Sequence, residues 1–562
     1  MAEIYSRRSV KVQKRSGFDK SFQNLFTSKP GTITPILTDE VIPCSTINLR
    51  VAMSACLPPL ASDTFMRVKL KYAAFFVPTR ILLPAGSYEK WLTGDDAVDS
   101  THIIMLPRLY LQNVVCNQSA GAKESGLNSR SLEPGSLADF LGVKVTKTQA
   151  PSDSTSSNVY NVSALPFLAY HKIYNDWFRN SLVQKDIFRT FTGSIYSAAT
   201  SNSVVPNNSS INSFVLSDAI SDSVKQGSTL FNDGVALTQL RQANFDIDLY
   251  TSASPSPQNG AAQKVSFDLV DSEGRPQTES SFTISALRAA NSIQQWLERN
   301  NIAGNRMVDY VKAQYGANLN DAIAQRPVLL GSGQFDVYSK GIYQTGMDNT
   351  VGMTQNPFTS VGARYGSAYA DGSDILIKGF TAQEPGYIMV VCWLSPRVTY
   401  STGMNPMFSR YIAPHSQSDM ANPILQNVGN EPIYARELSD KEVVGGDIFG
   451  YQDRYYAWKD KVDEVHGLLR DDSSLASFAL QRTFNTSTIP QISSAFLKIP
   501  VDYMDQVAAV KTDVSKYGYW CDTYFDYKVS MPLSKYCVPS LQDPAYEHGE
   551  DVIVSTRGTQ LT

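Results

Sequence analysis

The chain of 562 residues lacks long hydrophobic runs and is poor in cysteine and in charge. Its longest apolar stretch, YIMVVCWL at 387–394, is far shorter than the about 20 residues that a membrane-spanning helix needs, so we expect no membrane insertion. Six cysteines without a CxxC pair form no disulfide framework, and we expect reduced thiols. Charged residues make up 18% against 42% hydrophobic residues, which indicates a globular protein with an ample core.

The sequence also lacks the short motifs of common catalytic and metal sites. It contains no HExxH, GxSxG, Walker A or helix-opening GxGxxG pattern. The five histidines are isolated, at positions 102, 171, 415, 466 and 548. We therefore expect no enzyme activity, no metal and no cofactor. A carboxylate pair of the kind that glycosidases use stays open, because the fold assembles such pairs without a sequence spacing.

What the sequence does contain is a set of strand-like and helix-like segments. Apolar and polar residues alternate over 46–53 and 66–72, and the second segment continues fully apolar to Pro78. Alternation with period two predicts strands with one buried face. Further strands are expected at 386–394 and 523–529.

Helical periodicity appears between these strands. From Pro166 onward, aromatic residues follow at helical spacing and are expected to lie in the core: Phe167, Tyr170, Tyr174 and Trp177. A second helix is expected over about 284–300, and a third over about 305–315 before Gly316. Segments 117–160 and 193–229 are rich in small polar residues and show no period, so we expect exposed loops there.

The N-terminus carries a charge opposite to that of the whole chain. Residues 1–30 hold seven Lys or Arg against two Asp or Glu, while the chain as a whole has a net charge of −4. Five cations fall within residues 7–15, and clustered cations of this kind neutralise phosphates. The candidate nucleic-acid-binding residues are Arg7, Arg8, Lys11, Lys14 and Arg15. Two alternatives stay open: a solvated terminus, or a clamp on the acidic surface of a neighbouring subunit.

Residues 449–470 combine aromatic and charged side chains (FGYQDRYYAWKDKVDEVHGLLR). Tyrosine, tryptophan and arginine are enriched at the energetic centres of protein interfaces. The candidate subunit-interface residues are Tyr451, Arg454, Tyr455, Tyr456 and Trp458. The alternative, that this segment packs within its own subunit, stays open.

Longer blocks of sequence carry a family signal. GFDKSFQNLFTSKPGTITPILTDEVIPC (17–44), FFVPTRIL (75–82) and RQANFDIDLYTSASPSPQNG (241–260) are followed by blocks at 287–316, 325–333, 384–403, 449–470 and 519–541. In this collinear order they resemble the major capsid proteins of the Microviridae, in particular the gokushovirus-like branch of these small single-stranded DNA bacteriophages. Segments 117–160 and 193–240 have no counterpart, which leaves the shape of any surface protrusion open.

The resemblance implies a mainly β protein, an eight-stranded antiparallel jelly roll with long loop insertions and a few helices. Eight strands need only roughly 40–80 residues, so most of the chain would be loop, helix and inter-subunit surface. The implied organisation is a basic arm over 1–30 and a single jelly-roll domain over 31–562. Its insertions would be surface loops at about 94–160 and 193–282 and helices at about 284–316.

The function implied by the resemblance is structural. A major capsid protein would self-assemble into a small icosahedral shell around a circular single-stranded DNA genome, in the virion, after assembly in the bacterial host cytoplasm. Implied partners are copies of itself, packaged DNA, a small DNA-binding or internal protein, a minor or pilot protein and a host cell-surface receptor. Two alternatives stay open: a jelly-roll binding module (lectin-like or for host attachment), and a β-sandwich carbohydrate-active enzyme.

Overall fold

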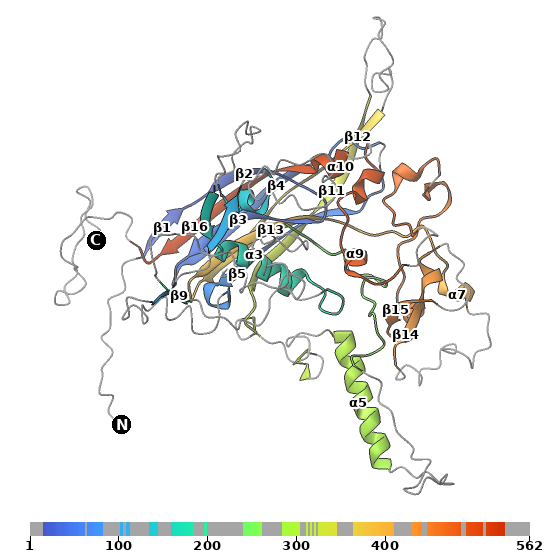
Figure 1. Ribbon diagram of the computed structural model, residues 1–562. Coiled ribbons are helices and arrows are strands. Elements are labelled where there is room, and N and C mark those ends of the chain that lie inside the picture. The colour runs from blue at the N-terminus through green and yellow to red at the C-terminus, as the bar shows by residue number, and fades with distance from the viewer. Residues whose placement is uncertain are drawn as a thin grey trace, which may run out of the picture.

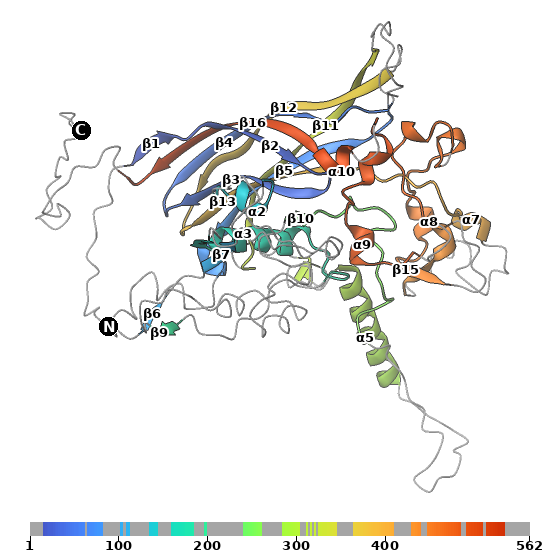
Figure 2. The same ribbon diagram turned by 45° about the horizontal axis from the view of Figure 1, so that its top comes forward.

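Two facing antiparallel sheets form the body of the protein, and a lobe of short elements lies at one end of them in the computed structural model (Figures 1 and 2). The structure describes residues 15–61, 64–82, 102–104, 108–112, 134–143, 159–184, 196–198, 240–260, 284–303, 311–312, 315–316, 320–321, 324–344, 364–409, 429–439, 447–471, 473–484, 490–509 and 513–533.

Eight long strands pair in a nested order along the chain: first with eighth, second with seventh, third with sixth and fourth with fifth. The resulting sheets read β2-β16-β4-β12 and β3-β13-β5-β11, and pairing of β11 with β12 joins them. Rolling up one long antiparallel hairpin produces this order, which is the one expected of a jelly roll. The strands are β2 (Phe22–Ser28), β3 (Thr32–Val41), β4 (Thr46–Cys56), β5 (Val68–Pro78), β11 (Val328–Gln344), β12 (Arg364–Thr381), β13 (Gly386–Pro396) and β16 (Tyr519–Met531).

The expected strands at 46–53, 66–78, 386–394 and 523–529 are confirmed as β4, β5, β13 and β16. In β4 and β16 every second side chain is buried, as alternation predicts for a sheet with one face outside the core. By contrast, β13 and the second half of β5 are buried on both faces. Their continuous apolar runs follow from this, because a strand covered on both sides needs no polar face.

Side chains from both sheets meet in the core between them. The Tyr72 hydroxyl of β5 donates to Asp374 of β12 at 3.1 Å, and the Tyr519 hydroxyl of β16 lies 4.0 Å from Cys392 Sγ of β13. The largest fully buried side chains are Tyr72, Tyr170, Tyr519, Tyr527, Phe75, Phe167, Phe525, Ile33, Ile47, Leu49, Met53 and Leu60.

Helix α3 (Leu165–Ile173) continues into η3 (Tyr174–Phe178) and covers the second sheet. Phe167, Tyr170 and Tyr174 are buried, which confirms that the aromatic stripe belongs to the core. The Tyr170 hydroxyl donates to the Ile33 carbonyl of β3 at 2.7 Å, and the Trp177 indole donates to the Pro327 carbonyl at 2.9 Å. These two bonds fix the helix against the sheet.

The lobe contains residues from well separated parts of the chain. Phe245, Leu249, Tyr250 and Ala253 are buried there, so residues 240–260 pack into the protein instead of forming the exposed loop expected over 193–282. Apart from the short strand β9 (Tyr196–Ala198), the rest of that loop lies outside the described residues. The lobe elements are α7 (Pro406–Ser409), β14 (Glu431–Tyr434), η7 (Ala435–Glu437), β15 (Ile448–Gln452), α8 (Tyr456–Lys459), η8 (Gly467–Leu469), η9 (Ala476–Phe478), α9 (Ser494–Leu497), η10 (Tyr503–Gln506) and α10 (Asp513–Tyr517).

The expected helix at 284–300 is confirmed as α5 (Ile284–Ala303), which extends away from both the sheets and the lobe (Figures 1 and 2). Most of the third expected helix, 305–315, lies outside the described residues. The remaining elements are β1 (Ser16–Asp19), η1 (Thr79–Leu82), β6 (His102–Ile104), β7 (Arg108–Gln112), α2 (Leu137–Phe140), β8 (Val159–Ser163), β9 (Tyr196–Ala198) and β10 (Arg241–Gln242).

Candidate functional site

The aromatic segment singled out in the sequence, 449–470, begins in β15, contains α8 and ends at Arg470 directly after η8. Tyr451 is anchored by its backbone: its N–H donates to the Ser254 carbonyl and its carbonyl accepts from the Ser254 N–H, both at 2.8 Å. Tyr455 has a left-handed backbone with φ of 65°, which turns the chain sharply into α8. This turn directs Tyr455 and Tyr456 inward and leaves Trp458 at the surface.

The five candidate interface residues therefore have different environments. Tyr455 and Tyr456 are buried, Tyr451 and Arg454 are half-buried, and Trp458 is 47% exposed. The Trp458 ring stacks on the Tyr455 ring with centroids 5.4 Å apart and planes at 13°, and the Arg454 guanidinium lies 5.5 Å from the centroid of the same Tyr455 ring. Trp458 is thus held in one orientation at the surface by the buried Tyr455.

A buried carboxyl lies beneath this surface. Glu437 is 5% exposed, and its two carboxylate oxygens accept hydrogen bonds from the Tyr456 hydroxyl at 2.8 and 2.7 Å. The Tyr434 N–H also donates to it at 3.2 Å. Burial raises the pKa of Glu437 to about 7, although the Tyr456 and Tyr434 hydrogen bonds act in the opposite direction.

A groove of about 730 Å³ opens above Glu437, and we call it the lobe groove. One wall is formed by residues 400–408 and the other by residues 457–470. Arg470 Nε donates to the Ser401 carbonyl at 2.8 Å and so joins the two walls. Ser401 lines the groove with its Oγ buried, and that oxygen has no hydrogen-bond partner among the described residues.

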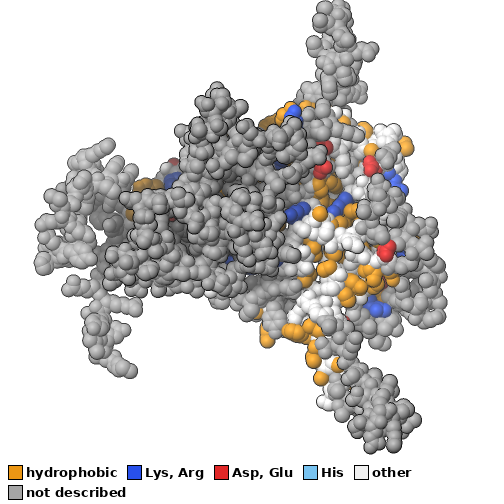
Figure 3. Space-filling model, viewed as in Figure 1, with side chains coloured by type: hydrophobic (Ala, Val, Ile, Leu, Met, Phe, Trp, Pro, Cys, Tyr) orange, Lys and Arg blue, Asp and Glu red, His pale blue; other side chains and the backbone are white. Residues whose placement is uncertain are grey.

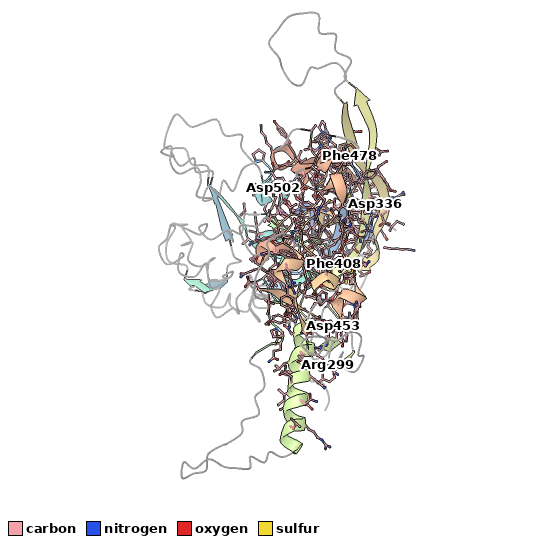
Figure 4. The ribbon with its side chains drawn as sticks, turned by 90° about the vertical axis from the view of Figure 1, so that its right-hand side faces the viewer. Arg299, Asp336, Phe408, Asp453, Phe478 and Asp502 are labelled. Atoms are coloured by element: carbon pink, nitrogen blue, oxygen red, sulfur yellow. The ribbon has the colours of Figure 1, made fainter. Side chains whose placement is uncertain are left out.

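The rim of the lobe groove is apolar and exposed. Met407 and Phe408 are 61% and 65% exposed, and Met404 and Trp458 are each about half exposed. Figure 3 shows hydrophobic side chains gathered over this part of the molecule, and Figure 4 labels Phe408 of the lobe, with Asp453 between it and α5. The candidates predicted from sequence did not include Met404, Met407 or Phe408 of the 400–408 wall. Their signal was available: MNPMF has three large apolar side chains beside Gly403 and Pro406, where a turn is expected.

The basic N-terminal segment is described only from Arg15 onward; Arg7, Arg8, Lys11 and Lys14 lie outside the described residues. The Arg15 guanidinium donates to Thr46 Oγ1 at 2.8 Å and to the Ser530 carbonyl at 3.1 Å. Residues 16–28 form β1 and β2, which both pair with β16. The second half of the segment expected as an arm is therefore part of a sheet.

The described ranges contain no candidate metal centre. No group of three His, Cys, Asp or Glu there could hold a metal ion. The four described cysteines, Cys44, Cys56, Cys392 and Cys521, are unpaired thiols. None of the described helices is both long and apolar enough to cross a membrane.

Comparison with known proteins matches nearly the whole chain. The family model described as capsid protein (F protein) matches residues 8–278 and 276–541. The chain is 24% identical to capsid protein VP1 of Chlamydia phage 1, over 96% of this chain and 98% of the relative. It is 25% identical to capsid protein VP1 of Bdellovibrio phage phiMH2K, over 94% and 95%. Capsid protein VP1 of Spiroplasma virus 4 is 24% identical over 46% of each chain.

Proposed function

Because this chain belongs to the capsid protein (F protein) family, we propose that it self-assembles into a small icosahedral shell around a circular single-stranded DNA genome. As a capsid protein it is a structural component of the virion; icosahedral symmetry, the enclosed DNA and assembly in the host cytoplasm belong to the proposal. The family match across residues 8–541 carries it. The nested strand order supports it too, since capsid proteins are one of the groups built on double-sheet jelly rolls.

The exposed apolar rim of the lobe groove adds a physical reason for self-association. Met404, Met407, Phe408 and Trp458 leave large apolar side chains in water on one side of the lobe. Burial of such area releases roughly 25 cal/mol per Å², and monomeric proteins seldom leave a contiguous apolar patch uncovered. We therefore propose the lobe groove as a subunit-contact surface, with Trp458 as its best-oriented anchor.

The proposed role of the N-terminal segment is contact with the packaged DNA. Its five cations lie within nine residues, and the last of them, Arg15, bonds to Thr46 of β4 and Ser530 of β16. Phosphate neutralisation by such a cluster does not depend on base sequence. The competing role is a clamp on a neighbouring subunit. The two roles differ in their effect on DNA: loss of the cations should lower the DNA content of particles only if the segment contacts DNA.

Size-exclusion chromatography and negative-stain imaging of the expressed protein test the proposal. We expect uniform particles, and nuclease-protected single-stranded DNA inside particles recovered from infected cells. A stable monomer or small oligomer that binds glycans would instead support the lectin-like or attachment module. Release of sugars from a glycan would support the carbohydrate-active enzyme.

A further inference from the structure

Arg241 of β10 is fixed against α3 and η3 by three contacts. Its backbone N–H donates to the Tyr170 hydroxyl at 2.8 Å, and its Nε donates to His171 Nδ1 at 3.2 Å. Its guanidinium also lies 5.8 Å from the centre of the Tyr174 ring. A histidine that accepts at Nδ1 is neutral, and so are tyrosine hydroxyls near neutral pH. None of these three neighbours therefore compensates the positive charge of Arg241.

One nitrogen of this guanidinium has no hydrogen bond. Arg241 Nη2 is buried and has no partner among the described residues. Burial lowers the pKa of Arg241, and only Tyr170 and Tyr174 act in the opposite direction. A buried charge is costly unless an opposite charge and hydrogen bonds compensate it. Arg241 is therefore expected to favour an anion at Nη2.

Lys498, directly after α9, is a second cation near Arg241. It lies opposite Asn244 in an isolated antiparallel bridge, and Asn244 donates to the Phe178 carbonyl of η3 at 2.9 Å. Figure 2 shows α3, β10 and α9 below the two sheets. Lys498 is half-buried; burial and the charge of Arg241 both lower its pKa, and no carboxylate of the described residues counteracts them. Because the two cations repel each other, an anion that contacts both would stabilise both.

Arg179 adds a third positive charge near Tyr174. Its backbone N–H donates to the Tyr174 carbonyl at 3.0 Å. Burial raises the pKa of the Tyr174 hydroxyl, while Arg241 and Arg179 lower it, so both guanidiniums act on this hydroxyl. Asp176 lies in the same turn, but it is paired with Lys172 at 3.1 Å and so does not neutralise the cluster.

A phosphate group has the shape and charge that this cluster favours. Arginine offers a planar fork of donors, and lysine offers a compact ammonium with rotatable donors. Here they come from separate elements, so their hydrogen bonds approach an anion from different directions. The tetrahedral oxygens of a phosphate can accept from both at once, whereas a planar carboxylate is best matched by one guanidinium alone.

We infer that Arg241 and Lys498, with Arg179 close by, bind a phosphate group beside Tyr174. The inference rests on the proposed function, because an enclosed DNA strand would supply phosphodiesters; free phosphate is the other source of the same chemistry. This site differs from the basic N-terminal segment in that α3, β10 and the chain after α9 position its cations. It would hold one phosphate at a defined place on each subunit.

Inorganic phosphate added to the unassembled chain tests the site without particles. The melting temperature should rise with phosphate to a plateau, and more than with potassium chloride at the same ionic strength. Lys498→Gln and Arg241→Gln should each weaken the apparent phosphate affinity at least about tenfold. Lys378→Gln, at an exposed lysine of β12, is the matched control and should keep the wild-type affinity. Equal affinities in Lys498→Gln and Lys378→Gln, or equal stabilisation by potassium chloride, would overturn the inference.

Acetylation of Lys498, measured by mass spectrometry, distinguishes the two sources of phosphate. In phosphate-free buffer, protection in DNA-filled particles but not in empty shells would identify the packaged strand. Reactivity in both, with protection after phosphate is added, would identify free phosphate. Protection in empty shells without phosphate would show that a neighbouring subunit covers Lys498 and would contradict a phosphate site. The proposed function fails separately, if the wild-type chain forms no particles while the unassembled chain still binds phosphate.

Discussion

The Tyr456 hydroxyl lies within 2.8 Å of both carboxylate oxygens of Glu437, and this pair forms the floor of the lobe beneath Trp458. Tyr250 adds a second hydroxyl, which donates to the Glu437 backbone carbonyl at 3.3 Å. The lobe groove therefore stands on a buried polar network whose carboxyl titrates near neutral pH. The stability of the lobe should therefore depend on pH.

We predict that Glu437 destabilises the lobe as the pH rises. Its pKa is about 7 when folded against 4.5 when unfolded, so the folded state holds the proton more tightly. The stability that the neutral carboxyl contributes is complete below pH 4.5 and is lost as the pH rises through 7, by on the order of 3 kcal/mol. Urea denaturation at pH 5 and pH 8 should show this loss in the wild type and little of it in Glu437→Gln. Asp460→Asn is the surface control, and an equal flattening in that variant would contradict the assignment.

A second prediction concerns Gly403, at the turn that begins the methionine-rich wall. Its φ is +95°, and a Cβ there would lie 2.2 Å from the Glu437 carbonyl oxygen. Gly403→Ala should therefore lower the free energy of unfolding by about 1–2 kcal/mol for the left-handed backbone. The clash of its Cβ should lower it by about 1–3 kcal/mol more. Gly142→Ala, with φ of +88° and nothing within 4 Å, should cost only the first part. Chemical denaturation of the two variants measures the difference, which would vanish if the turn could move freely.

A third prediction is that Trp458→Ala weakens assembly more than folding. The ring is half exposed and stacks on one buried tyrosine, so its removal takes little from the core but removes the best-oriented side chain of the proposed contact surface. Particle yield by size-exclusion chromatography should fall several-fold while the melting temperature of unassembled protein changes little. Trp520→Ala, at a 46% exposed tryptophan on β16, is the matched comparison. Normal yield from Trp458→Ala would remove this residue from the contact.

The fourth prediction tests the basic segment. Replacing all five cations of residues 7–15 by glutamine should lower the DNA content of particles and the salt sensitivity of filled particles, while empty shells still form. The same change at Lys29 and Lys378, exposed cations elsewhere, is the control. Full genome retention in the five-fold variant would leave the segment with the role of a subunit clamp.

Local sequence was sufficient to predict the strands, and also the helices that bury one regular face. Alternation over 46–53 and the aromatic spacing from Phe167 identify buried faces because those patterns depend only on backbone periodicity. The family resemblance, and with it the capsid function, also came from sequence, since blocks in a shared order persist where overall identity is only 24–25%.

Tertiary structure decided which of these residues reach the surface. Tyr455, Tyr456 and Trp458 are close neighbours with similar chemistry, and only the left-handed turn at Tyr455 separates two buried rings from an exposed one. The pairing of Ser16 with Met531, the burial of Phe245 and Tyr250, and the groove between 400–408 and 457–470 all join segments far apart in the chain. Periodicity carries no information about such pairings, because burial there depends on which distant segment covers a side chain.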